Sequence, residues 1–69
     1  MKNRIEELRT SQKLTQEEFA TLMQVSRQTI NSLENGKYNP SIFLAYKISK
    51  YFNLSIEEVF LFEQEKTTM

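Results

Sequence analysis

Several residue types on which many enzymes and metal proteins depend are missing from this sequence. The 69 residues include no cysteine, no histidine and no aspartate, so all nine acidic residues are glutamate. These absences exclude disulfide bridges, thiol chemistry, a histidine general base, and metal sites built from thiolate or imidazole ligands. A chain this short also leaves little room for a catalytic cleft. We therefore expect no catalytic residues, no metal, no cofactor and no small-molecule substrate.

Glycine and proline are almost as scarce, with one residue of each at Gly36 and Pro40. No linker or low-complexity tract divides the chain, which predicts a single domain over residues 1–62 and a polar tail over residues 63–69. Apolar runs such as residues 59–62 are far shorter than the roughly 20 residues that span a bilayer, and no signal-type segment follows the first residues. These features predict a cytoplasmic protein with no membrane partner.

What the sequence does contain is a helical pattern along most of its length. Apolar residues recur at three- and four-residue spacings and nowhere alternate over a long stretch, which predicts an all-α fold. Thr15 with Glu18, and Ser55 with Glu58, fit capping boxes at helix starts. Five short helices are expected: residues 3–12, residues 15–23, residues 26–35, a fourth helix between Ser41 and Asn53, and a last one that begins at Ser55.

The second and third predicted helices are separated by only two or three residues. Such a short connection does not allow antiparallel packing, so we expect the two helices to cross at a steep angle, as in a helix-turn-helix. On the third helix, Ile30 and Leu33 define the buried side. The opposite side carries amide and hydroxyl groups, namely those of Gln28, Asn31, Ser32 and Asn35.

Uncharged amides and hydroxyls of this kind suit hydrogen bonding to the edges of DNA bases. Gln28 can pair with N6 and N7 of an adenine, and Arg27, in the first turn of the same helix, can reach a guanine or a phosphate. The alternative is that these side chains form only a solvated helix face, because polar surfaces are ordinary in soluble proteins.

Three segments, residues 15–20, 25–31 and 33–37, make the sequence resemble a known family. They resemble the phage-repressor type of helix-turn-helix, the Cro/cI or XRE-like family, and the resemblance extends over residues 4–60. The length, and the runs at residues 26–31 and 37–41, are similar to the small stand-alone dimeric regulators of the cytolysin-operon repressor type. The resemblance implies a compact five-helix, lambda-repressor-like domain that represses transcription by binding operator DNA.

The resemblance also implies which residues touch DNA. Gln16, at the start of the second helix, matches a phosphate-contacting position, and helix N-termini attract anions; alternatively, Gln16 is an ordinary first-turn residue. The residues that match or adjoin base-reading positions are Arg27, Gln28, Asn31 and Ser32. The candidates for phosphate contacts are Thr15, Gln16, Ser26, Thr29, Asn35, Lys37, Tyr38, Asn39 and Ser41.

Arg9 and Glu34 look like surface charges, yet Glu34 lies towards the core side of the third helix. In the family that the sequence resembles, the matching residues pair with each other and tie the first helix to the third, so the resemblance implies a structural ion pair. A partly buried pair fixes orientation more than it adds stability, because desolvation offsets much of the attraction. The alternative role for Arg9 is a DNA contact.

The net charge is zero, whereas nucleic-acid-binding domains are usually basic. The charges are segregated, however, because residues 37–50 contain three lysines and no acidic residue, while residues 51–69 contain four glutamates and one lysine. The segment that begins at Lys37 therefore suits a phosphate, and we expect the acidic end to face away from DNA. Lys47 and Lys50 are alternatively no more than solvated side chains.

The C-terminal end of the domain carries more apolar surface than one short helix can bury. We expect part of it to face a second copy, in a two-fold dimer that sets two recognition helices about 34 Å apart and implies a palindromic operator. The alternative is that every side chain of this patch fills the core. The resemblance also suggests that residues 61–63 pair as a short strand with the N-terminus. The six residues of the patch are Leu54, Ile56, Val59, Phe60, Leu61 and Phe62.

The sequence therefore predicts a small regulator of transcription that binds double-stranded DNA as a homodimer. Repression is the expected effect, because blocking polymerase requires only occupancy of the site. A different class stays open, namely a protein-interaction module, such as an antitoxin or a partner-dependent regulator, that uses the apolar patch on another protein. An enzyme would need a glutamate or a tyrosine as its general base and is the least favoured interpretation.

Overall fold

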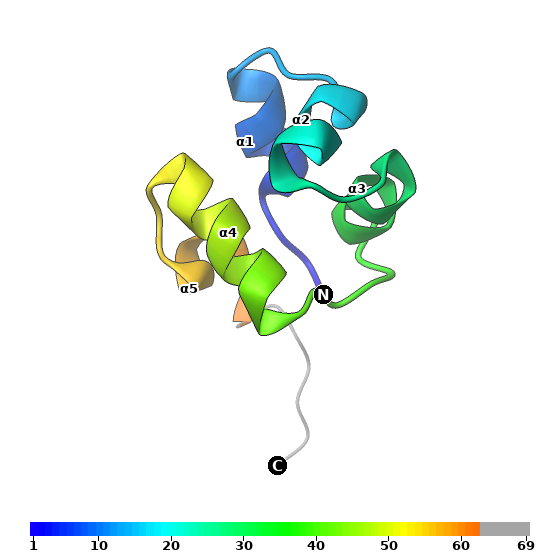
Figure 1. The fold of residues 1–69 in the computed structure, drawn as a ribbon. Coiled ribbons are helices and arrows are strands. Elements are labelled where there is room, and N and C mark those ends of the chain that lie inside the picture. Colours follow the sequence, from blue (N-terminus) through cyan, green and yellow to red (C-terminus); the bar gives the residue numbers. More distant parts are fainter. Residues whose placement is uncertain (63–69) are drawn as a thin grey trace.

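The computed structural model describes residues 1–62 of the chain. This part is all-α, as the sequence predicts, and its helices are joined by short connections (Figure 1). The bounds agree with the sequence-based prediction to within one or two residues. The five helices are α1 (Ile5–Ser11), α2 (Gln16–Met23), α3 (Arg27–Glu34), α4 (Ile42–Phe52) and α5 (Ile56–Val59).

Hydroxyl side chains fix the starts of four of these helices. The caps of α2 to α5 each accept the backbone N–H three residues later, and the capping boxes predicted at the starts of α2 and α5 are both present. Helix α1 begins differently, because its N-cap residue Arg4 makes no side-chain cap bond. Asn3 Oδ1 instead accepts the N–H of Ile5 at 3.0 Å. The four capping residues are Thr15, Ser26, Ser41 and Ser55.

The ends of α1 to α4 share a backbone device, in which the chain reverses through a residue with positive φ. After α3 this residue is Gly36, at φ 74°; its N–H donates to Leu33 O at 3.0 Å, and the N–H of Lys37 donates to Ser32 O at 3.0 Å. These two bonds make a Schellman motif, which satisfies carbonyls that the helix end leaves free. The other three residues with positive φ are Lys13, Gln24 and Asn53.

The N-terminal segment pairs with the chain that follows α5. The pairing is a single antiparallel bridge between Asn3 and Phe60, flanked by backbone hydrogen bonds from Arg4 to Val59 and from Leu61 to Lys2, both 2.9 Å long. It is centred earlier than the strand suggested at residues 61–63, and residue 63 lies outside the described residues. The bridge closes the domain by joining its two ends.

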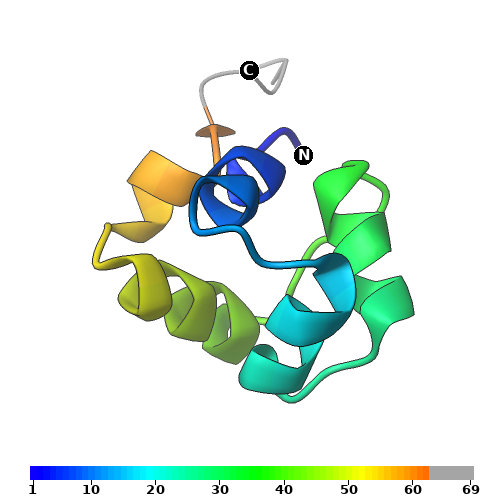
Figure 2. The same cartoon turned by 90° about the horizontal axis from the view of Figure 1, so that it is seen from above.

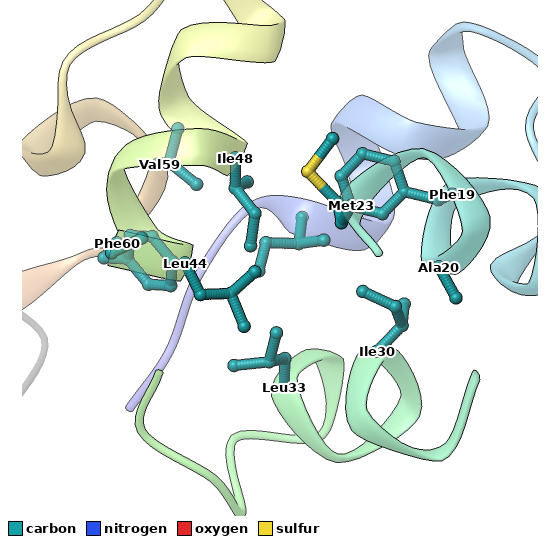
Figure 3. Packing of buried hydrophobic residues seen from close by; sticks show 11 residues of the cluster. Phe19, Ala20, Met23, Ile30, Leu33, Leu44, Ile48, Val59 and Phe60 are labelled. Atoms are coloured by element: carbon teal, nitrogen blue, oxygen red, sulfur yellow. The ribbon is translucent and has the colours of Figure 1, made fainter. Parts of the chain in front are cut away.

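Side chains from all five helices meet in one core (Figure 3). Within it, the ring of Phe19 from α2 lies 5.4 Å from that of Phe52 and 5.7 Å from that of Tyr51, both on α4, which holds these two helices together. The buried apolar residues are Ile5, Phe19, Ala20, Met23, Ile30, Leu33, Leu44, Ala45, Ile48, Val59 and Phe60.

Two members of the patch expected to face a partner belong to this core instead. Val59 is 0% exposed and Phe60 is 2% exposed. The reason lies in the backbone, because α5 ends after a single turn and the chain becomes extended at Phe60 (φ −105°, ψ 119°), where the terminal bridge holds it against the domain. The apolar surface at this end of the molecule is therefore smaller than the sequence suggests.

The five helices place α3 and α5 on opposite sides of the domain in both views (Figures 1 and 2). Helix α4 lies beside α5, and α2 packs against α3. A molecule that covered the α4–α5 side would consequently leave α3 exposed. Within residues 1–62, no helix has both the length and the hydropathy required to cross a bilayer.

Candidate nucleic-acid interface

Helix α3 turns its apolar side inward and its polar side to solvent. Ile30 and Leu33 are 0% exposed and lie in the core. Three of the four predicted base-reading residues, Arg27, Gln28 and Asn31, are exposed and line one open hollow of about 360 Å³. Ser32 is half-buried and lies outside the lining of this hollow.

A second hollow, of about 530 Å³, lies between the start of α2 and the start of α3. Thr15 and Gln16 line it together with Arg27, which borders both hollows. Glu17 also lines it, and sequence reasoning did not include this residue. Its carboxylate weakens the attraction of the hollow for an anion. Two arginines line the same hollow, but Arg9 is paired with Glu34, so Arg27 is left to balance the charge of Glu17.

The predicted pair of Arg9 and Glu34 is present behind this surface. Arg9 Nε and Nη2 donate to the two carboxylate oxygens of Glu34 at 2.6 and 3.2 Å, and Nη1 donates to the carbonyl of Leu14 at 2.7 Å. The two side chains are only 9% and 3% exposed. The hydrogen bond with Glu34 raises the pKa of Arg9 above its ordinary value, against the opposing effect of burial. The pair ties α1 to α3.

Gln16 extends this network to the exposed face. Its Nε2 donates to Glu34 Oε1 at 2.9 Å and to Asn31 Oδ1 at 3.3 Å. Both amide hydrogens are therefore used within the protein, and the remaining side-chain oxygen is an acceptor, which a phosphate oxygen does not bind. In this arrangement, the group that Gln16 can offer to a phosphate is its backbone N–H in the first turn of α2.

The cap of α3 uses the hydroxyls of Ser26 and Thr29 internally. Ser26 Oγ accepts the N–H of Thr29 at 3.1 Å and lies 2.9 Å from the Thr29 hydroxyl oxygen. These two residues set the direction of the first turn of α3. Their position leaves the backbone N–H groups of that turn at the surface, next to Arg27.

The loop after α3 supplies the remaining phosphate candidates. Lys37, Tyr38 and Asn39 are exposed, as is Asn35 at the end of α3. Ser41 is also exposed, and its hydroxyl accepts the N–H of Leu44 at 3.1 Å as the cap of α4. Among residues 1–62, no group of three or more histidine, cysteine or acidic side chains is placed to hold a metal ion.

Two side chains that position the helix-turn-helix escaped the sequence analysis. Lys47 Nζ, on α4, donates to the carbonyl of Met23 and to Gln24 Oε1, both at 3.1 Å, and so caps the end of α2. Asn3 Nδ2 donates to the carbonyl of Leu33, near the end of α3, at 2.8 Å. Both contacts join residues more than 20 positions apart, and no local sequence signal marks them.

The sequence analysis also missed an exposed apolar stripe on α4. Ile42, Phe43 and Tyr46 are 70%, 82% and 57% exposed. A signal for them exists, because the buried stripe that contains Leu44 and Ile48 leaves positions 42, 43 and 46 on the other side of the helix. Of the patch predicted at the C-terminal end, Leu54, Ile56 and Leu61 are half-buried, and Phe62 is 47% exposed.

Comparison with known proteins agrees with this geometry. A family model described as Helix-turn-helix matches residues 5–59, which run from the first residue of α1 to the last residue of α5. The chain belongs to this helix-turn-helix family. It is a DNA-binding regulator of transcription of the XRE type.

Relatives of this helix-turn-helix regulator occur in archaea and bacteria. An uncharacterized HTH-type transcriptional regulator from Archaeoglobus fulgidus is 52% identical over 66 residues, which are 96% of this chain and 93% of the relative. Another, from Methanocaldococcus jannaschii, is 47% identical over 66 residues, 96% of this chain and 100% of the relative. The HTH-type transcriptional activator BcrR of Enterococcus faecalis is 39% identical over 56 residues, 81% of this chain but 28% of BcrR.

Proposed function

We propose that this helix-turn-helix regulator binds a palindromic operator as a homodimer, with α3 in the major groove of each half-site, and that it represses transcription. The observation that carries the proposal is the exposed group of Arg27, Gln28 and Asn31 around one hollow of α3. The side chains of Arg27 and Gln28 have no hydrogen-bond partner within the described residues. Their donors and acceptors are free for DNA, on a helix whose rear side is held by Arg9 and Glu34.

The chemistry of each side chain suggests what it reads. Gln28 suits a bidentate contact with adenine, and Arg27 suits the O6 and N7 acceptors of guanine. Asn31 accepts a hydrogen bond from Gln16, which leaves the Nδ2 donor of Asn31 free to point at a base acceptor. Ser32 is short and half-buried, so its contact with a base would pass through a water molecule.

Contacts with the phosphates would set the position of α3 along the duplex. We assign them to the free backbone N–H groups in the first turns of α2 and α3, to the hydroxyl groups at these helix starts, and to the loop after α3. The N–H groups of Thr15 and Thr29 are not among them, because they donate to Glu18 Oε1 and Ser26 Oγ. Lys37 provides the free charge of that loop, whereas Lys47 is engaged at the end of α2. The residues assigned to this role are Thr15, Gln16, Ser26, Thr29, Asn35, Lys37, Tyr38, Asn39 and Ser41.

Repression follows from simple occupancy of the operator, and a regulator that resembles the cytolysin-operon repressor type would act in this way. A two-fold dimer would place two copies of α3 about 34 Å apart, one turn of DNA. In this proposal the protein has no catalytic activity, and its response would depend on its concentration and on the stability of its dimer.

The test is selection of binding sites from random duplex DNA at two salt concentrations. The wild-type protein is compared with Arg27→Ala/Gln28→Ala, and with the matched control Lys2→Ala/Gln12→Ala, which removes a cation and an amide from exposed positions outside α3. We expect the wild type and the control to enrich a palindrome with half-sites about one turn apart. The α3 variant should lose the sequence preference and keep weak, salt-sensitive binding.

Two results would contradict the proposal. If the α3 variant enriched the same palindrome as the wild type, bases would be read from another surface. If neither protein enriched any sequence, operator binding would be rejected, and the exposed apolar side chains of α4 would favour the other class, a module that binds a protein partner.

A further inference from the structure

A groove of about 360 Å³ is lined by residues of α4 and α5 and of the segments around α5. Helix α5 lies on the opposite side of the domain from α3 (Figures 1 and 2). The lining of the groove is mostly apolar and includes two exposed aromatic side chains, Tyr46 on α4 and Phe62 after α5. Leu54 and Ile56 also line it. Exposed aromatic side chains next to a hollow are typical of a surface that binds another protein molecule.

A buried polar group belongs to the same groove. Ser49, on α4, is 3% exposed and lines the groove, and its hydroxyl has no hydrogen-bond partner among the described residues. Buried hydroxyls in folded proteins are nearly always hydrogen-bonded. The oxygen is itself covered in the monomer, so an occupant of the groove could bond it only after the Ser49 side chain had rotated towards the groove.

Two opposite charges flank the groove. Among the described residues that line it, Lys50 on α4 and Glu57 on α5 are the charged ones, and both are exposed. Neither forms an ion pair within residues 1–62, where the observed pairs are Arg4–Glu7 and Arg9–Glu34. The groove therefore presents one unpaired cation and one unpaired anion from its two sides.

This charge pattern is complementary to itself. In a two-fold interface, if residue i of one copy contacts residue j of the other, then residue j of the first also contacts residue i of the second. Two copies that meet at this groove can therefore place each Lys50 against the partner's Glu57. Contacts of Lys50 with Lys50, or of Glu57 with Glu57, would instead bring like charges together. A hollow flanked by exposed aromatic rings fits the same arrangement, because the rings of one copy can enter the hollow of the other.

We propose that the groove is the seat of a second copy of this chain, with Lys50 of each copy paired with the partner's Glu57 and the partner's Phe62 inserted beside Tyr46. The inference rests on the homodimer of the proposed function and specifies its contacts. Because α3 and α5 lie on opposite sides of the domain, a copy seated here leaves both recognition helices exposed (Figures 1 and 2).

The test measures the dimer dissociation constant of the full chain by sedimentation equilibrium, for Lys50→Glu, for Glu57→Lys, for the double variant and for an equimolar mixture of the two single variants. Each single variant turns two attractive contacts into repulsive ones, so we expect its dissociation constant to rise about tenfold or more. The mixture should return to within about threefold of the wild type, because a heterodimer of Lys50→Glu with Glu57→Lys restores both pairs. Lys2→Glu serves as the control, since it reverses one exposed charge outside the groove.

The mixture also separates contacts between copies from contacts within one chain. If the double variant recovered and the mixture did not, the two residues would act within one chain and the inference would be wrong. Wild-type dissociation constants for both single variants would equally overturn it, because the dimer would then form elsewhere. A monomeric wild type would reject both the inference and the homodimer.

Operator selection distinguishes these failures from failure of the proposed function. Dimers that follow the charge-reversal pattern but enrich no DNA sequence would support the interface and reject operator binding. A wild type that enriches a palindrome while the single variants bind it with unchanged affinity would support the function and overturn the interface.

Discussion

The α2–α3 side of the molecule and its α4–α5 side use opposite chemistry. Behind α3, charged and amide groups are paired with one another, as in the contacts that Glu34 accepts from Arg9 and Gln16. On the α4–α5 side, large apolar side chains such as Phe43 and Phe62 are exposed, and the buried hydroxyl of Ser49 has no partner within residues 1–62. In the part of the chain that the structure describes, the buried polar groups of the first side are hydrogen-bonded, whereas the second side exposes apolar area and buries one hydroxyl without a hydrogen bond.

The difference shows how a small domain can use one surface to hold a helix in a fixed orientation and another to expose apolar area that can bind a partner. A buried ion pair adds little net stability but permits few geometries, so it suits a helix whose exposed side chains must meet defined atoms. Apolar area contributes free energy roughly in proportion to the surface buried, with little demand on direction. Substitutions on the two sides can test this contrast, and removal of a buried aromatic ring is expected to have the largest effect.

Two phenylalanines near the end of the domain should differ sharply. Phe60→Ala should lower the free energy of unfolding by about 4 kcal/mol, because Phe60 is 2% exposed and its removal leaves a cavity. Phe62→Ala removes the same ring from a residue that is 47% exposed, and should cost under about 1 kcal/mol when measured at protein concentrations where dimers are absent. Urea denaturation of both variants is the measurement. Equal losses would mean that Phe62 is part of the core.

Breaking the network behind α3 should have the next largest effect. Arg9→Ala should lower the free energy of unfolding by about 3 kcal/mol, because it leaves the carboxylate of Glu34 buried without its cation. Arg4→Ala is the matched control, since the Arg4–Glu7 pair is 37% and 67% exposed and should contribute under about 1 kcal/mol. Thermal and urea denaturation compare the two. An Arg9→Ala protein that is as stable as the wild type but fails to bind operator would assign Arg9 to DNA instead.

The contact of Asn3 with the end of α3 can be removed while its contact with α1 is kept. Asn3→Asp retains an acceptor for the N–H of Ile5 but loses the donor to Leu33 O and places a negative charge beside the carbonyl end of α3. We expect a loss of about 1–2 kcal/mol. Native-state amide exchange should accelerate selectively at Gly36 and Lys37, which close α3. Acceleration that is uniform over the whole domain would contradict a local role for Asn3.

The smallest effect is expected at the unpaired hydroxyl of α4. Ser49→Ala should change the free energy of unfolding by less than about 0.5 kcal/mol or raise it slightly, because the variant removes a buried group that forms no hydrogen bond among the described residues of the monomer. Ser41→Ala, the control on the same helix, should cost about 1 kcal/mol through loss of the N-cap bond to Leu44. A larger loss at Ser49 than at Ser41 would show that the Ser49 hydroxyl is bonded in solution.

Much of the fold could be predicted from the sequence because its signals are local. Thr15 and Ser55 each lie three residues before the glutamate that completes a capping box, and both boxes are present in the structure. Gly36 has the positive φ that a helix end requires. Lys13 and Gln24 adopt the same conformation without being glycine, and propensity alone gives no warning of such positions, because the surrounding packing imposes them.

The candidate site was predictable only in part, for the same reason. Arg27, Gln28 and Asn31 share one side of one helix, so the helical repeat alone places them together. The pairing of Arg9 with Glu34 came from the resemblance to a family, since no local pattern joins them. Lys47 looked like a solvated lysine until the fold placed it at the end of α2.

By itself, the sequence determined the number and limits of the helices, the helix-turn-helix and the polar side of α3, because each depends on neighbours within a turn or two of the chain. Only the tertiary structure decided that Val59 and Phe60 belong to the core, that the amide hydrogens of Gln16 are already engaged, and that a groove separates Lys50 from Glu57. These outcomes depend on how the helices pack against one another and on where the terminal bridge holds the chain. The spacing of residues along the sequence contains no information about either.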